Sequence, residues 1–273
     1  MKIGFISDIH IDFFPSDFDV HEEFLKSFSQ YDIDMLVIAG DISNNYKNTI
    51  SFVRNLNIKL SYDVYYVPGN HDMWNKKVDE STLEIYEAYK QDDNCLVNKT
   101  VHLIDDVYLI GDVFWYDYTF ADQSFDINAL VSKTHGKRVW QDSIYVDWKT
   151  SDREVSQKMI EKAKKRIENN PEARYILVSH MINHKDFTVN PEWREEWAFF
   201  NGFLGSENIY QLIKEANIDI AVCGHVHFRR IINEDDKKFI CCCLSYPKEW
   251  KLFDDSSDEL SYHIQAALEV VEI

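Results

Sequence analysis

Apolar residues in the first quarter of the chain follow two kinds of spacing. Short apolar runs at residues 2–7, 33–39 and 63–67 have the length and composition of β-strands. The second run is apolar almost throughout, as in a strand that is covered on both faces. Residues 20–30 and 48–60 instead repeat their apolar positions at helical spacing. This strand–helix–strand–helix–strand order predicts a parallel sheet with right-handed crossovers.

The rest of the chain predicts a second, partly antiparallel sheet with its own helices. The helix over residues 151–168 is the clearest of these elements, because Ser151 and Glu154 form a capping-box pattern at its start. The other expected elements are helices at 78–90 and 207–216, strands at 95–97, 101–104, 107–113, 174–179 and 218–223, a hairpin of 227–233 with 238–244, and a closing strand at 263–273. Together these elements indicate an α/β protein.

Two segments lack a clear period. Residues 114–149 hold many aromatic side chains among polar ones, which suits a packed insertion and also a cap beside a site; we favour the packed insertion. Residues 181–205 form a long loop that contains Trp193 and Trp197. No repeat, low-complexity tract or linker interrupts the sequence, so we expect a single domain over residues 1–273.

Several of the predicted strands end in Asp, Asn or His, and ligands of open α/β sheets bind beyond such ends. The residues at these ends are Asp8-Ile9-His10, Gly40-Asp41, Gly69-Asn70-His71-Asp72, Ser179-His180 and Gly224-His225-Val226-His227. In extended backbone the outer residues of Asp-x-His and His-x-His point the same way, so each pair can present two ligands to one space. Carboxylate, imidazole and amide donors together indicate a borderline divalent metal such as manganese, iron, zinc or cobalt.

Composition and charge narrow the possible partners. The net charge of −18 argues against duplex nucleic acid, while a local metal-rich cleft can still take a small anion. The five cysteines include no Cys-x-x-Cys pair, and we interpret the run Cys241-Cys242-Cys243 as reduced, apolar strand residues. The N-terminus lacks a secretory apolar core, and no apolar run approaches the ~20 residues of a membrane helix. We therefore expect a soluble, cytoplasmic protein that does not associate with membranes.

The strand-end motifs, taken together, resemble those of the calcineurin-like metallophosphoesterases. The matching motifs are Asp8-Ile9-His10, Gly40-Asp41-Ile42-Ser43-Asn44, Gly69-Asn70-His71-Asp72, Ser179-His180 and Gly224-His225-Val226-His227, which span residues 8 to 227. The resemblance implies a sandwich of two β-sheets flanked by helices, with a dimetal centre above the strand ends. The insertion at 114–149 and the tail after about residue 245 lie outside the resemblance.

By this resemblance the metal ligands form two groups that share one carboxylate. The implied ligands are Asp8, His10 and His227 for one divalent ion, Asn70, His180 and His225 for the other, and Asp41 as the bridge between them. Manganese is the favoured metal, with iron, zinc, cobalt or nickel as alternatives. Two metals roughly 3.5–4 Å apart polarise phosphoryl oxygens and lower the pKa of a bridging water. The implied enzyme is a phosphoric ester hydrolase whose bridging hydroxide attacks a phosphomonoester or phosphodiester of a small or nucleotide-like substrate.

The resemblance places His71 in the site as a catalytic residue that binds no metal. Its unperturbed pKa of about 6.5 suits it to stabilise the phosphoryl group or to protonate the leaving oxygen. Many relatives have Asp where this chain has Asn44, so the partner that orients His71 adds no charge here. Asp72 is either a supporting residue or a turn residue. Arg229 shares a strand face with His227, so it either reaches substrate or lies in solvent.

Two other functions are weighed against hydrolysis of a small phosphoester. A DNA nuclease of the same superfamily is disfavoured by the net charge of −18 and the lack of a basic stripe. A metal-binding scaffold that serves a protein partner without catalysis is disfavoured because every motif residue is present, including His71. The sequence makes no prediction of the oligomeric state.

Overall fold

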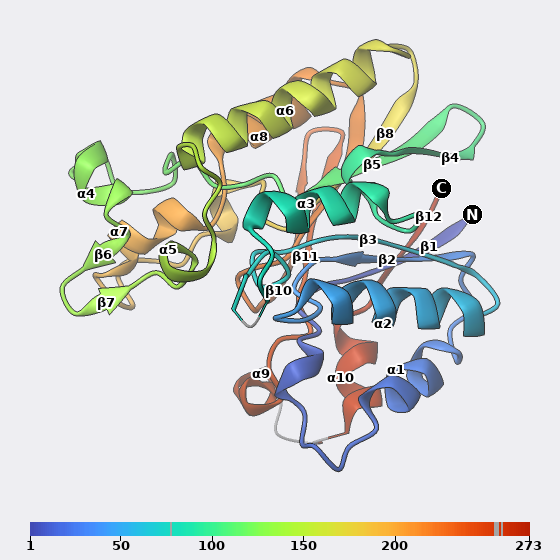
Figure 1. Cartoon of the computed structure of the whole chain (residues 1–273). Helices are drawn as coiled ribbons and strands as arrows, with labels where there is room; N and C mark the ends of the chain where they lie inside the picture. The colour runs from blue at the N-terminus through green and yellow to red at the C-terminus, as the bar shows by residue number, and fades with distance from the viewer. Residues whose placement is uncertain (77, 254–256, 258) are drawn as a thin grey trace.

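Two β-sheets lie at the centre of the computed structural model, which describes residues 1–76, 78–253, 257 and 259–273 (Figure 1). The four-stranded sheet has the order β12-β1-β2-β3, with β1 Lys2–Ile6, β2 Met35–Ala39, β3 Asp63–Val67 and β12 Glu269–Glu272. The six-stranded sheet has the order β10-β11-β9-β8-β5-β4, with β4 Thr100–Ile104, β5 Val107–Asp112, β8 Arg174–Ser179, β9 Ile218–Cys223, β10 Arg229–Glu234 and β11 Lys237–Cys242. A separate hairpin pairs β6 Thr134–His135 with β7 Arg138–Val139.

The strand directions agree with the predicted topology. In the first sheet β1, β2 and β3 run parallel, with Phe5 opposite Val37 and Val37 opposite Tyr65, and β12 is antiparallel to β1. In the second sheet β5, β8, β9 and β11 are parallel, while β4 and β10 form antiparallel edges. The parallel strands of each sheet therefore direct their carboxyl ends to a common edge, where a site can form.

Alternation along the strands divides the core into two parts. Ile3 and Phe5 of β1 face inward, where they join Val178 and Val222 of the opposite sheet in one buried cluster. Ile6 belongs to the other cluster, which lies between strands and helices. The two sheets thus pack on each other through alternate side chains, as in other two-sheet sandwiches.

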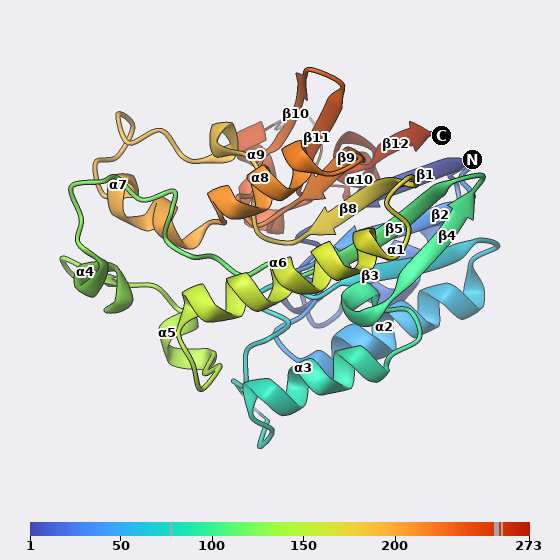
Figure 2. The ribbon, with the colours of Figure 1, turned by 90° about the horizontal axis from the view of Figure 1, so that it is seen from above.

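Helices cover the outer sides of the sandwich (Figure 2). In the contacts between elements, α2 packs beside β3, α6 beside β5, α8 beside β9, and α1 against α10. The α-helices are α1 Val20–Phe28, α2 Tyr46–Lys59, α3 Thr82–Gln91, α4 Ile127–Val131, α5 Asp142–Tyr145, α6 Asp152–Glu168, α7 Trp197–Phe200, α8 Glu207–Glu215, α9 Trp250–Phe253 and α10 Leu260–Ala267. Short 3-10 helices are η1 Ile11–Phe13, η2 Leu96–Asn98, η3 Lys185–Phe187, η4 Asn201–Phe203 and η5 Pro247–Glu249. The predicted capping box of Ser151 and Glu154 is present at the start of α6.

Two of the predicted strands are wrong. Residues 95–97 lead into the 3-10 helix η2, and Cys95 makes only an isolated bridge to Tyr66. Residues 263–273 divide into the end of α10 and the short strand β12. The buried residues of α10 include Leu260, Ile264 and Ala267, and this helical spacing packs the helix against α1. Both segments are too short for apolar spacing to separate helix from strand.

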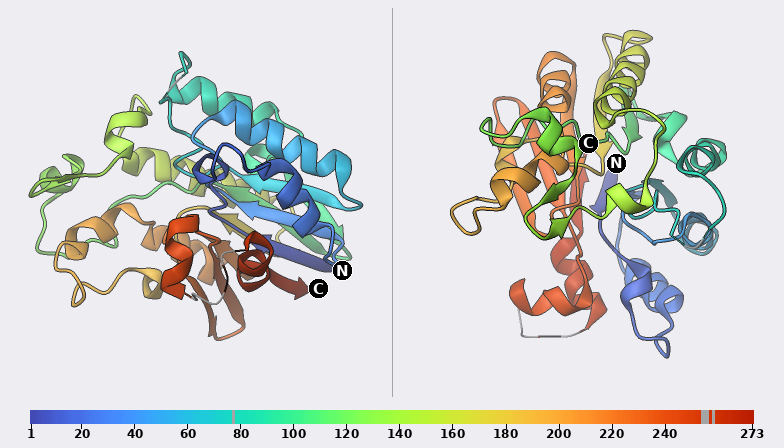
Figure 3. Two further views of the ribbon diagram at one scale, coloured as in Figure 1. Left: turned by 90° about the horizontal axis from the view of Figure 1, so that it is seen from below. Right: turned by 60° about the vertical axis from the view of Figure 1, so that its left-hand side comes forward.

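The insertion at residues 114–149 and the loop at 181–205 pack on each other. The insertion contributes α4, β6, β7 and α5, and the loop contributes α7. These elements lie together on the side away from both termini (Figure 1, Figure 3). The Asp122 amide donates to the Ala198 carbonyl at 2.8 Å, and the His135 ring stacks on Phe199 with centroids 4.9 Å apart. The insertion is therefore a packed element, as we favoured.

Two further expectations concern the whole chain. All five cysteines are free and buried, so the run Cys241-Cys242-Cys243 packs as apolar residues, as predicted. No helix in the described part of the chain combines the length and the apolar character that are needed to cross a bilayer.

Candidate metal centre

Strand ends of both sheets meet at one site. In the four-stranded sheet β1 leads to Asp8 and β2 to Asp41, while in the six-stranded sheet β8 leads directly to His180. The sheets are joined at this point by backbone hydrogen bonds, from the Ser7 amide to the Cys242 carbonyl at 3.0 Å and from the Leu244 amide to the Ser7 carbonyl at 2.8 Å. All seven predicted metal ligands lie in this region, divided into two groups of donor atoms.

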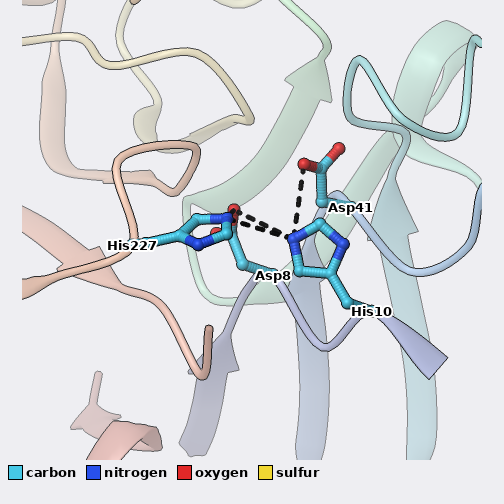
Figure 4. Close-up of side chains that lie close together, drawn as sticks. All are labelled: Asp8, His10, Asp41 and His227. Atoms are coloured by element: carbon cyan, nitrogen blue, oxygen red, sulfur yellow. Dashed lines mark hydrogen bonds and ion pairs between the residues drawn. The ribbon is translucent and has the colours of Figure 1, made fainter. Parts of the chain in front are cut away.

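The first group holds Asp8, His10, Asp41 and His227, whose side chains turn toward one another (Figure 4). The Nε2 atoms of His10 and His227 are 3.1 Å apart. Asp8 Oδ1 lies 3.4 Å from His227 Nε2, and Asp41 Oδ2 lies 3.7 Å from His10 Nε2. One donor atom from each residue falls within 4.8 Å of the others, which is close enough for a single cation to contact all four.

The second group is centred on His180 and shares Asp41 with the first. His180 Nε2 lies 3.3 Å from Asp41 Oδ1, 3.1 Å from Asn70 Oδ1 and 3.2 Å from His225 Nδ1. Asp41 therefore turns one oxygen to each group, which is the arrangement expected of a bridging carboxylate.

Hydrogen bonds outside the second group determine which atoms face inward. The Nδ1 of His180 lies 2.9 Å from the Ala39 carbonyl oxygen, so it carries the ring proton and leaves a lone pair on Nε2. In the same way His225 donates from Nε2 to the Phe203 carbonyl at 3.2 Å and leaves Nδ1 unprotonated. Lone pairs thus face one another across the group without a hydrogen between them, and this donor set fits a divalent cation.

Burial keeps most of the site imidazoles neutral. It lowers the pKa of His10 well below its ordinary value, and neighbouring imidazoles lower it further. Burial also lowers the pKa of His225, to about 3. At neutral pH both rings are therefore uncharged, which is the form that binds metals.

The carboxylates show that the site favours positive charge. Burial raises the pKa of Asp41 well above its ordinary value, and the charges of Asp8 and Asp72 add to this effect. Burial opposes the charged form of His227, but hydrogen bonds that its ring donates to the carboxylates of Asp8 and Glu249 outweigh this effect and raise the pKa of His227. Without a metal, a proton on His227 neutralises Asp8; a divalent ion would take the place of that proton.

Five of the candidate ligands have left-handed backbone. The φ angles are 54° at Asp8, 42° at His10, 55° at Asp41, 75° at His225 and 55° at His227. The prediction that extended backbone aligns the Asp-x-His and His-x-His pairs is therefore wrong. Such conformations cost roughly 1–3 kcal/mol each in a residue with a side chain, and they gather at functional sites because the surrounding fold holds them there.

Glycines allow the loops to approach one another. A Cβ on Gly69 would lie 2.1 Å from Asp41 Oδ1 and 2.5 Å from the Asp41 amide nitrogen. A Cβ on Gly224 would lie 2.4 Å from Asp8 Oδ2. Only glycine fits at either position without displacing one of the two carboxylates.

His71 lies beside the two groups and is held from two sides. Its Nδ1 is 2.6 Å from Asn44 Oδ1, and its ring stacks on Trp74 with centroids 3.8 Å apart. Its Nε2 lies 3.9 Å from Asp41 Oδ2 and 3.5 Å from the Tyr246 hydroxyl. Asn44 thus occupies the position from which the ring can be oriented. Burial lowers the pKa of His71 well below its ordinary value, and the neighbouring imidazoles lower it further.

Asp72 supports the loops around the site. Its buried carboxylate accepts hydrogen bonds from the Gly69 amide at 2.7 Å, the Ser43 amide at 2.9 Å and the Thr49 hydroxyl at 2.6 Å. These bonds tie the loop after β2 to the turn after β3. Asp72 therefore holds Asp41 and His71 in place through their backbones.

Arg229 is not among the residues that line the pocket at this site, and its Nε donates to the Cys243 carbonyl at 3.0 Å.

A pocket of about 440 Å³ opens above the two groups. Six apolar residues that line the pocket are named the apolar wall: Val139, Trp140, Val189, Trp197, Leu204 and Val226. Val139 and Trp140 belong to the insertion, so this segment also lines the pocket. The sequence also left polar residues of this site unassigned, among them Asp142, Tyr246 and Glu249. They lie in segments outside the motifs, and nothing in the spacing of those segments marked them.

Comparison with known proteins places the chain in a family. A curated relative, a probable cyclic nucleotide phosphodiesterase of Fibrobacter succinogenes, is 36% identical over 92 residues, which are 31% of this chain; the chain spans about 35% of the relative's length. The fold is shared with a phosphopantetheinyl hydrolase from Mycobacterium tuberculosis, at 16% identity and a TM-score of 0.76 over 99% of this chain and 95% of that one. A dimetal phosphatase from Danio rerio is similar over 88% of this chain and 86% of its own, at 12% identity and a TM-score of 0.50. Residues 1–229 match the calcineurin-like phosphoesterase family, and the chain belongs to that family.

Proposed function

We propose that this chain is a dimetal phosphodiesterase that acts on a small substrate with an apolar arm. The observation that carries the proposal is the pair of buried donor groups that share Asp41. Asp8, His10 and His227 would hold one divalent ion with Asp41, and Asn70, His180 and His225 would hold the other. Mixed carboxylate, imidazole and amide donors suit a borderline ion, and we propose manganese.

The residues around the groups have distinct parts in the proposed reaction. Bound divalent ions supply Lewis-acid polarisation of the phosphoryl oxygens and acidify a water at the site. His71, oriented by Asn44 and Trp74, presents Nε2 to the space above Asp41, within reach of a phosphoryl or leaving oxygen. Burial lowers the pKa of His71, which favours the neutral ring, and a negative charge beside the ring would favour its protonation. Tyr246, whose hydroxyl faces the same nitrogen, closes this side of the site.

The charges around the pocket favour a diester over a monoester. Of the described residues that line the pocket, Arg138 is the only lysine or arginine. It forms an ion pair with Glu196. The lining also includes the carboxylates of Asp142 and Glu249. A phosphomonoester carries a second negative charge above a pKa of about 6. The described residues that line the pocket offer no unpaired lysine or arginine side chain for that charge. A diester keeps a single charge.

The apolar wall indicates the kind of arm that the diester carries. Trp140 and Trp197 are partly exposed and line the pocket with smaller aliphatic residues. Flat or aliphatic groups gain free energy by leaving water for such a surface. The names of the two relatives, a cyclic nucleotide phosphodiesterase and a phosphopantetheinyl hydrolase, both denote phosphoesters with a large organic group. The charge of −18 disfavours a DNA substrate.

The test compares a diester with a monoester on protein loaded with Mn²⁺. We expect kcat/KM for bis(p-nitrophenyl) phosphate to exceed that for p-nitrophenyl phosphate by about tenfold or more, a difference of about 1.4 kcal/mol. The matched control is Asp41→Asn, which should lose both metal and turnover. A preference for the monoester would reject the diester assignment. No turnover of either substrate by protein that holds two metal ions would reject the proposed function as a whole.

A further inference from the structure

Asp142 is a buried carboxylate for which the described residues provide no ion pair. It begins α5 within the insertion and is fully buried. A buried carboxylate that lacks a cationic partner is costly unless N–H donors satisfy it. Asp142 Oδ1 accepts from Asn70 Nδ2 at 2.9 Å and from Trp74 Nε1 at 2.8 Å, and Oδ2 accepts from Trp140 Nε1 at 2.9 Å. Three donors thus converge on it, and among the hydrogen bonds of the described residues Asn70 is the one candidate ligand that it contacts.

The contact with Asn70 decides which end of the amide faces the second donor group. An asparagine amide has an oxygen that accepts and a nitrogen that only donates. Because a carboxylate accepts, the amide nitrogen must face Asp142, and Asn70 Oδ1 is left 3.1 Å from His180 Nε2. The reversed amide would set its oxygen against the Asp142 carboxylate and its nitrogen toward the cation. Asp142 therefore selects the one orientation in which Asn70 can ligate a metal.

The other two donors connect this carboxylate to catalysis and to substrate binding. Trp74 stacks on His71, and Trp140 belongs to the apolar wall. A single side chain of the insertion thus contacts one candidate ligand, the ring that holds His71, and the surface expected to receive the substrate.

We propose that Asp142 is a positioning residue that orients Asn70 for the second metal and couples the insertion to the metal centre. The proposal rests on the proposed function, since it concerns the metal that Asn70 would hold. Residues that orient ligands in this way typically change metal affinity by 10–100-fold when they are replaced. The effect should fall on the second group alone, because Asp142 contacts none of the side chains of Asp8, His10 and His227 in the hydrogen bonds of the described chain.

The test uses Asp142→Asn and the double variant Asp142→Asn/Trp140→Phe. In Asp142→Asn one oxygen becomes an NH₂ group, which meets an N–H donor whichever way the new amide turns. Replacing Trp140 as well removes the donor on one side, so the amide oxygen can again accept from Asn70 and Trp74. Isothermal titration calorimetry, in which Mn²⁺ is added to the metal-free protein, should show two binding sites in the unchanged chain. We expect Asp142→Asn to weaken one site by 10–100-fold and to leave the other unchanged.

Recovery in the double variant separates positioning from general damage. We expect the double variant to bind Mn²⁺ at the weakened site at least tenfold more tightly than Asp142→Asn does. Trp140→Phe alone should keep both metal sites. Equal weakening of both sites, no weakening, or no recovery in the double variant would overturn the proposal. If Asp142→Asn does not fold, as judged by circular dichroism, the double variant compared with Trp140→Phe decides the question. Failure of the unchanged chain to bind two Mn²⁺ ions would instead count against the proposed function.

Discussion

Replacing Gly69 with alanine should disrupt the metal centre through one added methyl group. The new Cβ would lie 2.1 Å from Asp41 Oδ1 and 2.5 Å from the Asp41 amide nitrogen, whereas ordinary van der Waals contact begins at about 3.4 Å. The Asp41 carboxylate, the proposed bridge, would therefore have to retreat by roughly 1.3 Å. The backbone of Asp41 cannot move away freely. The Asp72 carboxylate accepts from the Gly69 amide at 2.7 Å and from the Ser43 amide at 2.9 Å, and so ties the turn after β3 to the loop after β2.

The expected loss follows from that displacement. A misplacement of about 1 Å at a reacting centre costs on the order of 10²-fold in rate. Since Asp41 faces both donor groups, we expect Gly69→Ala to lose at least one bound Mn²⁺ and to lower kcat/KM for bis(p-nitrophenyl) phosphate by about 10²-fold or more. Metal content is measured by inductively coupled plasma mass spectrometry after gel filtration, and turnover by release of nitrophenol.

A matched control is available within the same sheet. The nearest atoms to a Cβ on Gly4, in the middle of β1, would belong to the flexible Ile33 and Leu268 side chains, at 3.0 Å and 3.2 Å, and neither residue belongs to the two donor groups. Gly4→Ala should therefore alter the melting temperature and leave metal content unchanged. If Gly69→Ala binds two metal ions and retains activity within threefold of the unchanged chain, the inference that glycine is required beside Asp41 is refuted.

Three further outcomes follow from the site and its surroundings. His71→Ala should keep its metal while kcat falls by about 10²-fold or more, and a loss of metal would instead make His71 a ligand. Trp197→Ala should raise KM for bis(p-nitrophenyl) phosphate by roughly tenfold, on the scale of burying an apolar side chain, and an unchanged KM would remove this residue from the substrate surface. Hydrogen bonds from Tyr210, Lys214 and His184 lower the pKa of Glu234 from 4.5 to about 2, so the stability that it contributes is present above pH 4.5 and is lost as the pH falls toward 2. Glu234→Gln should therefore have a melting temperature that falls less steeply than that of the unchanged chain between pH 4.5 and 2, and parallel curves would contradict the assignment.

Local patterns were enough to predict the two sheets and the position of the site. Apolar runs such as residues 33–39 mark buried strands, and the polar residues that follow them lie at the carboxyl ends because strands of a parallel sheet share one direction. Errors in the predicted secondary structure were confined to short segments. Residues 95–97 are too few to define a period, and the apolar positions of residues 263–273 are so dense that they fit both helix and strand, so packing on distant elements decides the conformation of both segments.

The supporting residues of the site could not be predicted because they depend on contacts between distant segments. Asp142 and Asn70 are 72 positions apart in the sequence, and Glu249 reaches His227 from the segment that follows β11. The left-handed backbone conformation of the candidate ligands was also not predicted. Left-handed φ angles at residues such as His225 oppose the ordinary preference of a histidine, so they follow from the whole fold rather than from local sequence.

Because both sheets supply side chains to each donor group, metal binding should affect the stability of the fold. Each group joins side chains from both layers, with Asp41 on one side and His180 or His227 on the other. An ion in either group would act as a further tether between two layers that are also held by apolar contacts and by backbone hydrogen bonds at Ser7. Binding to the folded chain alone adds about 2.7 kcal/mol at a free metal concentration of 100 times Kd. We expect the resistance of this chain to heat and to proteases to rise with the logarithm of the metal concentration around it.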